Sequence, residues 1–277
     1  MKILLIGASG CFGTEFSKVC KEKKIAVISY KSKKLDVSNF TQLKKKIHIL
    51  KPNIILNSSA IVGINQCEIE YNNAFKVNTI GALNLAKICS DKNIILIQTS
   101  THAVFDGKKT NFYTEKDTPN PNNVYSGSKY LSEVFVKAIC KKYYIIRFPT
   151  LFGNRKNNLL GFVDKVKKAL KENKNLKIAK DKIDTPTYAR DAAFLLVHIL
   201  QKKYKYGTYH LANSGKTSYF EFVKYMKKKL GSKSKIIPAK DKDFISVGFK
   251  PLRTSLKSTK LPKLRDWKKS INEYLSN

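Results

Sequence analysis

The sequence predicts an α/β protein in which a doubly wound parallel sheet is followed by a smaller α/β part. Short apolar runs alternate with amphipathic helical patterns through residues 1–150, which is typical of a parallel sheet covered by helices on both faces. A glycine-rich turn directly follows the first run. After residue 150 the alternation loosens into short strands, Lys-rich helices and polar turn clusters. We therefore expect a cofactor-binding half followed by a substrate-facing part.

Each element of the first half follows from its local pattern. The expected strands are KILLIG (2–7), IAVISY (25–30), NIILN (53–57), NIILIQTS (93–100) and YYIIRF (143–148). Helical patterns lie between them, at about 12–23, 39–50, 68–91 and 123–142. This order of strands and helices predicts successive parallel strands joined by helical crossovers.

The composition is that of a globular protein with a strongly basic charge. The 277 residues are 42% hydrophobic, which is enough to bury a large core. The formal net charge of +34 could attract nucleic acid. However, only five of the 54 basic residues are arginine, and the lysines are spread over every expected surface. We therefore expect no nucleic-acid partner.

Cysteine usage and apolar stretches bear on other classes of protein. Five cysteines, without a CxxC pair or histidine partners at ligand spacing, suggest neither a disulfide framework nor a metal site. The longest apolar stretch, AAFLLVHIL (192–200), is too short to cross a bilayer, and no signal-peptide pattern precedes the first strand. We expect a cytoplasmic protein without a membrane partner.

The motif GASGCFG places Gly7, Gly10 and Gly13 between the first strand and the first helix, with Cys11 and Phe12 in the same turn. Glycines at such a turn let the backbone approach a diphosphate, whose charge meets free amides at the positive end of the helix. The motif predicts a Rossmann-type dinucleotide-binding fold, and we expect these five residues to contact the cofactor.

The end of the second strand bears on the choice of cofactor. An acid there would bind the ribose 2′-hydroxyl of NADH, but the chain instead reads Tyr30, Lys31, Ser32, Lys33, Lys34. The missing acid and the nearby cations favour NADPH. If these lysines are ordinary solvated residues, NADH remains possible.

Asp36 and Val37 follow in the segment KKLDVSN. Both could touch the adenine edge of the cofactor. Alternatively, Asp36 could cap the helix that begins near Asn39.

Tyr125 and Lys129 stand four residues apart at the start of an expected helix, and hence on one face of it. A neighbouring cation stabilises a phenolate, which makes tyrosine a usable proton donor or acceptor near neutral pH. In so lysine-rich a chain the pair could also arise by chance. Ser100 and Thr101 end the fourth strand, where open α/β sheets place their ligands, so a hydroxyl there could share a substrate carbonyl with the phenol.

Ordered motifs along nearly the whole chain support the functional interpretation. They are GASGCFG, LDVS, NSSAIVGINQCE, VNTIGALNLA, STHAVFDG, PNNVYSGSK, RFPTLFG, DTPTYARDAA, GTYHLANSGKTSYFEF and PLRTSLKSTKL. In these motifs the sequence resembles the extended short-chain dehydrogenases, and within them the dTDP-4-dehydrorhamnose reductase group of sugar-nucleotide reductases.

The resemblance implies roles for particular residues. Tyr125 would protonate the substrate carbonyl as hydride arrives, Lys129 would lower the pKa of Tyr125 and hold the nicotinamide ribose, and Thr101 would orient the carbonyl. Further expected cofactor contacts are Ser59, Ala60 and Asn78, and further expected substrate contacts are Ser100, His102, Thr150, Asp181, Thr187 and Arg253.

The resemblance also implies a division of the chain. Residues 1–150, with about 183–205 returning to the sheet, would form the dinucleotide-binding domain. About 151–182 with 206–277 would form the substrate-binding domain. The state of assembly is expected to be a monomer or a homodimer.

Two departures from the family pattern fall in the expected substrate pocket. His102 and Ala103 replace an acid and an aromatic residue beside Thr101, and Thr150 stands where a tryptophan is usual. His102 could be a second proton donor or a hydrogen-bonded structural residue.

The expected function is NAD(P)H-dependent reduction of the 4-keto group of a nucleoside-diphosphate deoxysugar for surface polysaccharide biosynthesis. Two alternatives remain at this point. One is a non-catalytic dinucleotide-binding regulatory subunit. The other is a related sugar-nucleotide epimerase or dehydratase.

Overall fold

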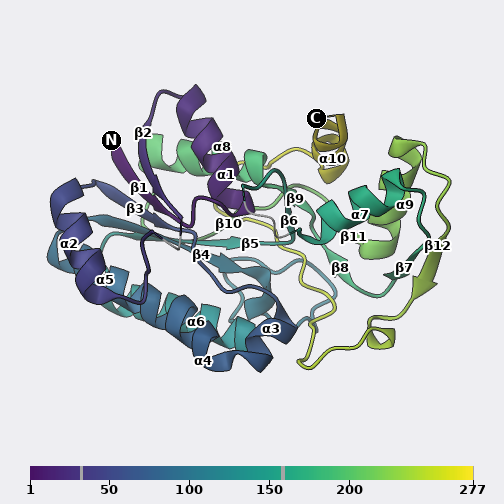
Figure 1. The fold of residues 1–277 in the computed structure, drawn as a ribbon, viewed down its shortest axis with the longest axis horizontal. Helices are drawn as coiled ribbons and strands as arrows, with labels where there is room; N and C mark the ends of the chain where they lie inside the picture. Colours follow the sequence, from purple (N-terminus) through teal and green to yellow (C-terminus); the bar gives the residue numbers. More distant parts are fainter. Residues whose placement is uncertain (32–33, 157–159, 277) are drawn as a thin grey trace.

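A parallel sheet forms the centre of the molecule. The computed structural model describes residues 1–31, 34–156 and 160–276, and in these residues six strands form the sheet in the order β10-β5-β4-β3-β1-β2 (Figure 1). Every neighbouring pair is parallel. The strands are β1 (Lys2–Ile6), β2 (Ala26–Tyr30), β3 (Ile54–Asn57), β4 (Ile95–Thr101), β5 (Tyr143–Phe148) and β10 (Gly207–His210). The predicted α/β fold with a parallel sheet is confirmed.

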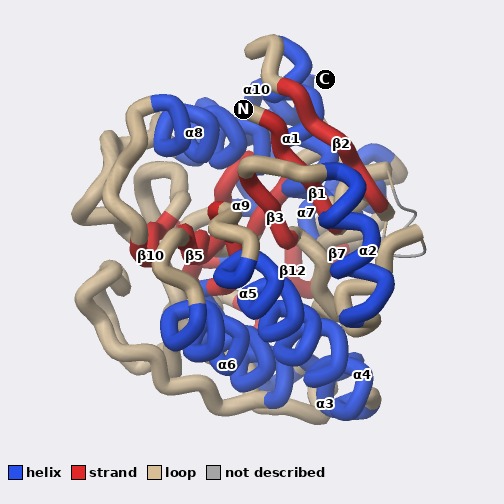
Figure 2. The backbone as a smooth tube through the Cα atoms, turned by 90° about the vertical axis from the view of Figure 1, so that its left-hand side faces the viewer, coloured by secondary structure: helices blue, strands red, loops and turns tan. Residues whose placement is uncertain are grey.

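Helices cover both faces of the sheet, as Figure 2 shows. Ile3 and Leu5 of β1 pack toward α1 and α8, whereas Leu4 and Ile6 pack toward α2, α5 and α6. Consecutive side chains of a strand point to opposite faces, so a continuous apolar run serves both layers. Burying each of these side chains contributes about 1.5–3 kcal/mol. The helices are α1 (Cys11–Glu22), α2 (Phe40–Leu50), α5 (Gly81–Asp91), α6 (Val124–Ile139) and α8 (Ala189–Gln201).

The helix expected at about 68–91 is not continuous. The chain forms α3 (Ile64–Ile69), α4 (Tyr71–Ala74) and a π-helical turn, η1 (Phe75–Ile80), before α5 begins. Asn78 lies in the π-helical turn, where its amide bonds both the amide and the carbonyl of Ile61 and also reaches Ser128 Oγ. These contacts to distant segments accompany a wider turn that helical periodicity did not predict.

The smaller part lies beyond the carboxyl ends of the strands, on the right in Figure 1. Its apolar core includes Phe152, Phe222 and Trp267. Three two-stranded sheets pair β6 (Leu151–Phe152) with β9 (Thr187–Tyr188), β7 (Leu176–Ala179) with β12 (Ile236–Ala239), and β8 (Ile183–Asp184) with β11 (Thr217–Ser218). Its helices are α7 (Phe162–Lys171), α9 (Tyr219–Leu230) and α10 (Trp267–Ser276), and it contains a short 3₁₀ turn, η3 (Asp241–Asp243). Another 3₁₀ turn, η2 (His102–Val104), directly follows β4 of the central sheet.

One boundary of the expected division is wrong. Residues 207–210 were placed in the smaller part, but they form β10 at the edge of the central sheet, parallel to β5. The reason is that α8 packs against α1 on one face of the sheet. The segment that follows α8 therefore begins next to β5 and pairs with it. The rest of the division remains a prediction.

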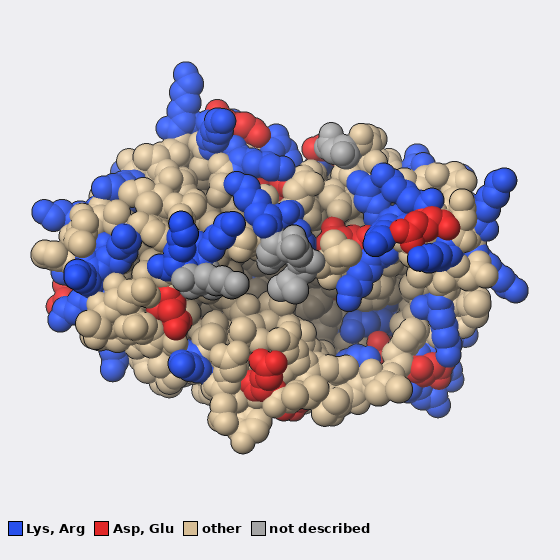
Figure 3. Space-filling model, in the orientation of Figure 1, with Lys and Arg blue, Asp and Glu red and all other residues tan. Residues whose placement is uncertain are grey.

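The face drawn in Figure 3 is basic without one dominant stripe. Lysine and arginine side chains are scattered over the face in Figure 3, with acidic side chains among them. Within the described ranges, no helix has both the length and the apolar character needed to span a bilayer.

Candidate active site

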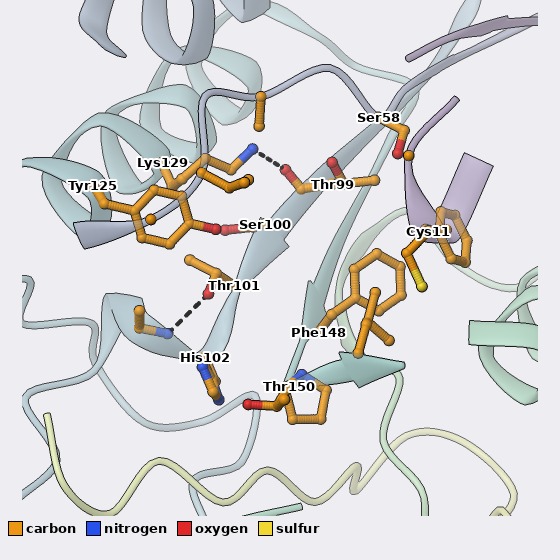
Figure 4. A pocket seen from close by; sticks show the side chains of 18 of the residues that line it. Cys11, Ser58, Thr99, Ser100, Thr101, His102, Tyr125, Lys129, Phe148 and Thr150 are labelled. Atoms are coloured by element: carbon orange, nitrogen blue, oxygen red, sulfur yellow. Dashed lines mark hydrogen bonds between the residues drawn. The ribbon is translucent and has the colours of Figure 1, made fainter. Parts of the chain in front are cut away.

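A pocket of about 450 Å³ opens at the carboxyl ends of the central strands. Parallel strands that end at one edge bring their following loops together, although these loops are far apart in sequence. The lining comes from the glycine loop, the loop after β3, the end of β4 with η2, the first turns of α6, and the segment after β5. In Figure 4, Tyr125, Lys129 and Thr101 lie on one side of the pocket, and Cys11 and Phe148 lie across from them.

The glycine loop fits a dinucleotide diphosphate. Gly7 has φ +84°, and a Cβ on it would lie 2.5 Å from the carbonyl carbon of Ser58. A Cβ on Gly13 would lie 2.5 Å from the Gly7 oxygen, so the turn closes tightly only with glycine. Gly10 begins α1 without any capping side chain and lines the pocket with Cys11. The positive end of α1 is therefore available to an anion.

Residues 154–156, which follow β6, are hydrogen-bonded to the glycine loop and to the helix after it. The backbone amide and side-chain amide of Asn154 both donate to Glu15 Oε1, at 3.0 and 2.8 Å, and the Lys156 amide donates to the Ser9 carbonyl at 2.9 Å. Arg155, between them, lines the pocket and pairs with an acid of α7. The motif pattern did not single out Arg155, nor did it single out Glu15 and Asn154, which lie 139 residues apart in the sequence.

The end of β2 shapes the same loop. The Tyr30 carbonyl accepts two amides of the glycine loop, at 3.0 and 3.2 Å. Lys46 Nζ lies 5.1 Å from the centre of the Tyr30 ring, and the Lys34 amide donates to the Lys31 carbonyl. Two further residues of the expected cofactor region, Ser32 and Lys33, lie outside the described residues.

Asp36 and Val37 have local roles in the structure. The Asp36 carboxylate accepts the amide and the hydroxyl of Ser38, at 2.9 and 2.8 Å. The cap of α2 is instead Asn39, whose side chain accepts the Gln42 amide. Val37 is 3% exposed and belongs to the core under α5. The alternative in which Asp36 caps α2 is therefore wrong.

Two more predicted residues, Ser59 and Ala60, lie in the loop after β3, and a third, Asn78, bonds to this loop from η1. Ala60 lines the pocket, while Ser59 and Asn78 do not. The Ser59 amide bonds Asn57 Oδ1, and among the described residues its buried hydroxyl has no partner. Asn78 bonds the backbone amide and carbonyl of Ile61, and so it helps to hold the shape of the loop after β3.

The predicted catalytic trio comes together in the pocket. Asn123 caps α6 by accepting the Ser126 amide at 2.8 Å, which places Tyr125 in the first turn of the helix. Tyr125 and Thr101, which ends β4, line the same pocket. Lys129 follows one turn later, and its Nζ donates to the carbonyl of Thr99 at 2.6 Å (Figure 4).

Burial sets the proton affinities of the pair. It raises the pKa of Tyr125 to about 12, and the Thr101 side chain acts in the opposite direction. Burial lowers the pKa of Lys129 to about 8, although the charge of Glu133 opposes this change. The phenol is therefore protonated at neutral pH. The expectation that Lys129 lowers the pKa of Tyr125 stays a prediction.

A buried ion pair holds this helix on the sheet. Arg147 of β5 donates to both oxygens of Glu133, at 2.9 and 2.6 Å, and Ser100 Oγ donates to Glu133 Oε1 at 2.6 Å. Burial acts to raise the pKa of Glu133, but Arg147 brings the net value below the ordinary one. The Ser100 hydroxyl thus bonds inward, and it joins β4, β5 and α6 behind the trio.

Behind His102 and Thr150 lies a buried residue that sequence reasoning missed. Asp184 is 1% exposed, and its Oδ1 lies 3.0 Å from His102 Nδ1. Its Oδ2 accepts the Thr150 amide at 2.8 Å. His102 and Thr150 both line the pocket, as expected.

Three expected substrate contacts do not line the pocket. Asp181 accepts the Asp241 amide. Thr187 is fully buried and bonds within the smaller part. Arg253 is exposed, but it precedes Thr254, whose hydroxyl lies 3.2 Å from His102 Nδ1, so this segment borders the pocket.

Fold and pocket together define a Rossmann-type reductase of the short-chain class. The family described as RmlD substrate binding domain matches residues 1–277, and the chain belongs to this family. The family that the motifs indicated is thus confirmed.

Curated relatives and solved structures agree with this assignment. The chain is 31% identical over 228 residues to a dTDP-4-dehydrorhamnose reductase of Aggregatibacter actinomycetemcomitans, covering 80% of this chain and 76% of the relative. It is 28% identical to the spore coat polysaccharide biosynthesis protein SpsK of Bacillus subtilis, covering 99% and 96%.

Among solved structures, a dTDP-4-dehydrorhamnose reductase of Clostridium acetobutylicum has a TM-score of 0.93 and 33% identity, over 100% of this chain and 99% of that one. The Bacillus anthracis reductase, solved in complex with NADP, also has a TM-score of 0.93, with 28% identity and the same coverage.

Proposed function

We propose that this protein reduces the 4-keto group of a nucleoside-diphosphate deoxysugar with NAD(P)H. The observation that carries the proposal is the convergence of Thr101, Tyr125 and Lys129 with the glycine loop in one pocket. The substrate class is supported by relatives named dTDP-4-dehydrorhamnose reductases. A relative named for spore coat polysaccharide biosynthesis supports a role in making surface polysaccharide.

Each member of the trio has a distinct task. A nicotinamide cofactor held at the glycine loop would supply the hydride for the carbonyl carbon. Tyr125 donates its proton to the carbonyl oxygen, and a pKa of about 12 keeps that proton on the phenol until it is needed. Thr101 orients the carbonyl from the end of β4. Lys129 provides positive charge beside the phenolate that forms and holds the nicotinamide ribose.

NADPH is the proposed cofactor, because no acid ends β2. Lys31 and Lys34 follow Tyr30 in the sequence, and Lys46 lies over the Tyr30 ring. These cations suit a 2′-phosphate. The solved relative with bound NADP supports the same choice.

We also propose that the reaction takes place in the cytoplasm. All five cysteines are free, which is typical of a reducing compartment.

The test is to mix the purified protein with NADPH and a panel of nucleoside-diphosphate 4-keto-6-deoxysugars and to follow nicotinamide absorbance. The matched control is Tyr125→Phe, which removes one oxygen from a partly buried side chain. We expect it to stay folded and to lower single-turnover hydride transfer by about 10²-fold or more. A folded Tyr125→Phe protein with wild-type transfer would show that the acid lies elsewhere. Binding of NADPH without reduction of any sugar would favour the regulatory alternative.

A further inference from the structure

A histidine and a buried carboxylate lie beside the trio and are given no task in the proposed reduction. The His102 side chain is 17% exposed and lines the pocket, whereas the Asp184 side chain is 1% exposed. His102 Nδ1 is 3.0 Å from Asp184 Oδ1 and 3.2 Å from Thr254 Oγ1. One edge of the imidazole ring is therefore held by the protein, and the ring itself faces the pocket.

The partners of Asp184 determine which ring nitrogen carries the proton. Burial acts to raise the pKa of this carboxyl, but His102 and hydrogen bonds from Thr150 and Thr185 bring the pKa below its ordinary value, so the group is ionised at neutral pH. Its oxygens accept two backbone amides. The amides are those of Thr150 and Thr185, at 2.8 and 2.7 Å. A carboxylate can only accept, so the proton toward it is on Nδ1. In the neutral ring, Nε2 on the opposite edge is then an acceptor.

We infer that His102 Nε2 accepts a hydrogen bond from the sugar hydroxyl on the carbon next to the reduced carbonyl, and so selects substrates with that hydroxyl. The inference rests on the proposed function, which places the carbonyl at Thr101 and Tyr125. His102 directly follows Thr101 in the chain and lines the same pocket, so it faces substituents near the carbonyl carbon.

The substrate class narrows the partner to one group. In a 4-keto-6-deoxyhexose, one carbon beside the carbonyl carries a hydroxyl and the other carries a methyl. Only the hydroxyl can donate to an acceptor. An analogue without it leaves a partly desolvated ring nitrogen unpaired, which costs affinity.

Asp184 acts through His102 as a positioning residue. Its Oδ1 holds the Nδ1–H tautomer, while its Oδ2 holds the backbone of Thr150 on the same side of the pocket. An amide at this position could donate to Nδ1 and convert Nε2 into a donor. The effect of Asp184 on selectivity thus depends on which ring nitrogen is protonated.

The experiment compares two nucleoside-diphosphate 4-keto-6-deoxyhexoses that differ only in having a hydroxyl or a hydrogen next to the carbonyl. We expect the wild type to prefer the hydroxyl-bearing sugar by about 10²-fold in kcat/KM. His102→Leu, similar in size but without an acceptor, should reduce this preference below about 10-fold. His102→Gln, whose amide oxygen can accept, should restore part of it. Thermal melting checks that each variant is folded.

Affinity for both sugars is also measured by calorimetry on protein loaded with NADP⁺, where no reduction can occur. Asp184→Asn should weaken the preference in affinity only in part, because the sugar hydroxyl can also accept from a protonated Nε2, and it should still bind the oxidised cofactor. Equal affinity of the wild type for both sugars, or an unchanged preference in folded His102→Leu, overturns the inference even if reduction is observed. A preference in binding that is lost in His102→Leu supports the inference even if neither sugar is reduced. In that case only the proposed function fails.

Discussion

Lys129→Met should make the protein more stable while removing its activity. The side chain of Lys129 is 2% exposed, and burial lowers its pKa from 10.5 to about 8. Each pKa unit corresponds to about 1.4 kcal/mol, so folding disfavours this ammonium by about 3 kcal/mol. Methionine has no charge to bury. It does lose the bond to the Thr99 carbonyl, which contributes about 1.5–3 kcal/mol as a bond to a charged group. We expect a net stabilisation of about 1 kcal/mol at pH 7.

The pH dependence gives a sharper test. The folded-state pKa of Lys129 lies below the unfolded value, so between about pH 8 and 10.5 the unfolded chain holds the proton that the folded protein has lost. Unfolding then takes up a proton, and rising pH stabilises the wild type relative to Lys129→Met. The advantage of the variant is therefore greatest below pH 8 and should fall by about 3 kcal/mol by pH 10.5. The other lysines titrate equally in both proteins and cancel from the difference.

The measurement is thermal or urea unfolding of both proteins from pH 7 to 10.5, with hydride transfer at each pH. About 1 kcal/mol corresponds to about 2 °C in melting temperature for a chain of this length. A variant that is less stable at pH 7 by a margin independent of pH would refute the argument that burying this charge is costly.

Three further predictions follow from the same contacts. NADPH should bind more tightly than NADH, and the double change Lys31→Ala with Lys34→Ala should remove most of that preference in fluorescence titrations. Arg147→Met should destabilise the fold by about 3–5 kcal/mol in urea unfolding, because it leaves Glu133 charged and buried. The kcat/KM for a productive ketosugar should fall as pH rises above about 8, because Lys129 loses its ammonium there.

Each of these three predictions would be contradicted by a specific result. Equal affinity of the wild type for the two cofactors would mean that the lysines after β2 do not bind a 2′-phosphate. Arg190→Met, which breaks a more exposed pair with Glu22, is the matched control for Arg147→Met and should cost less than about 1 kcal/mol. Similar losses of unfolding free energy in both variants would contradict the argument that breaking the buried Arg147–Glu133 pair is especially costly. A kcat/KM unchanged up to pH 10 would show that the charge of Lys129 is not needed.

Much of the fold could be predicted because its signals are local. The strands of the first half and the glycine turn follow from periodicity and from backbone constraints within a few residues, as at Gly7 and Gly13. The helical spacing of Tyr125 and Lys129 likewise placed both in one pocket. The amino-acid sequence by itself therefore determined the class of fold, the cofactor loop and the residues of the proposed trio.

The features that were not predicted depend on contacts between segments that lie far apart in the sequence. Asp181 and Asp184 are both aspartates in the same short stretch of sequence. Only Asp184 is buried against His102, which lies 82 residues away in the chain. Local pattern likewise did not predict the π-helical turn at Asn78 or the placing of β10 beside β5. Burial and hydrogen-bond partners depend on how the layers pack, and no window of a few residues contains that information. Tertiary structure alone thus set the environment of His102 and Asp184 at the pocket.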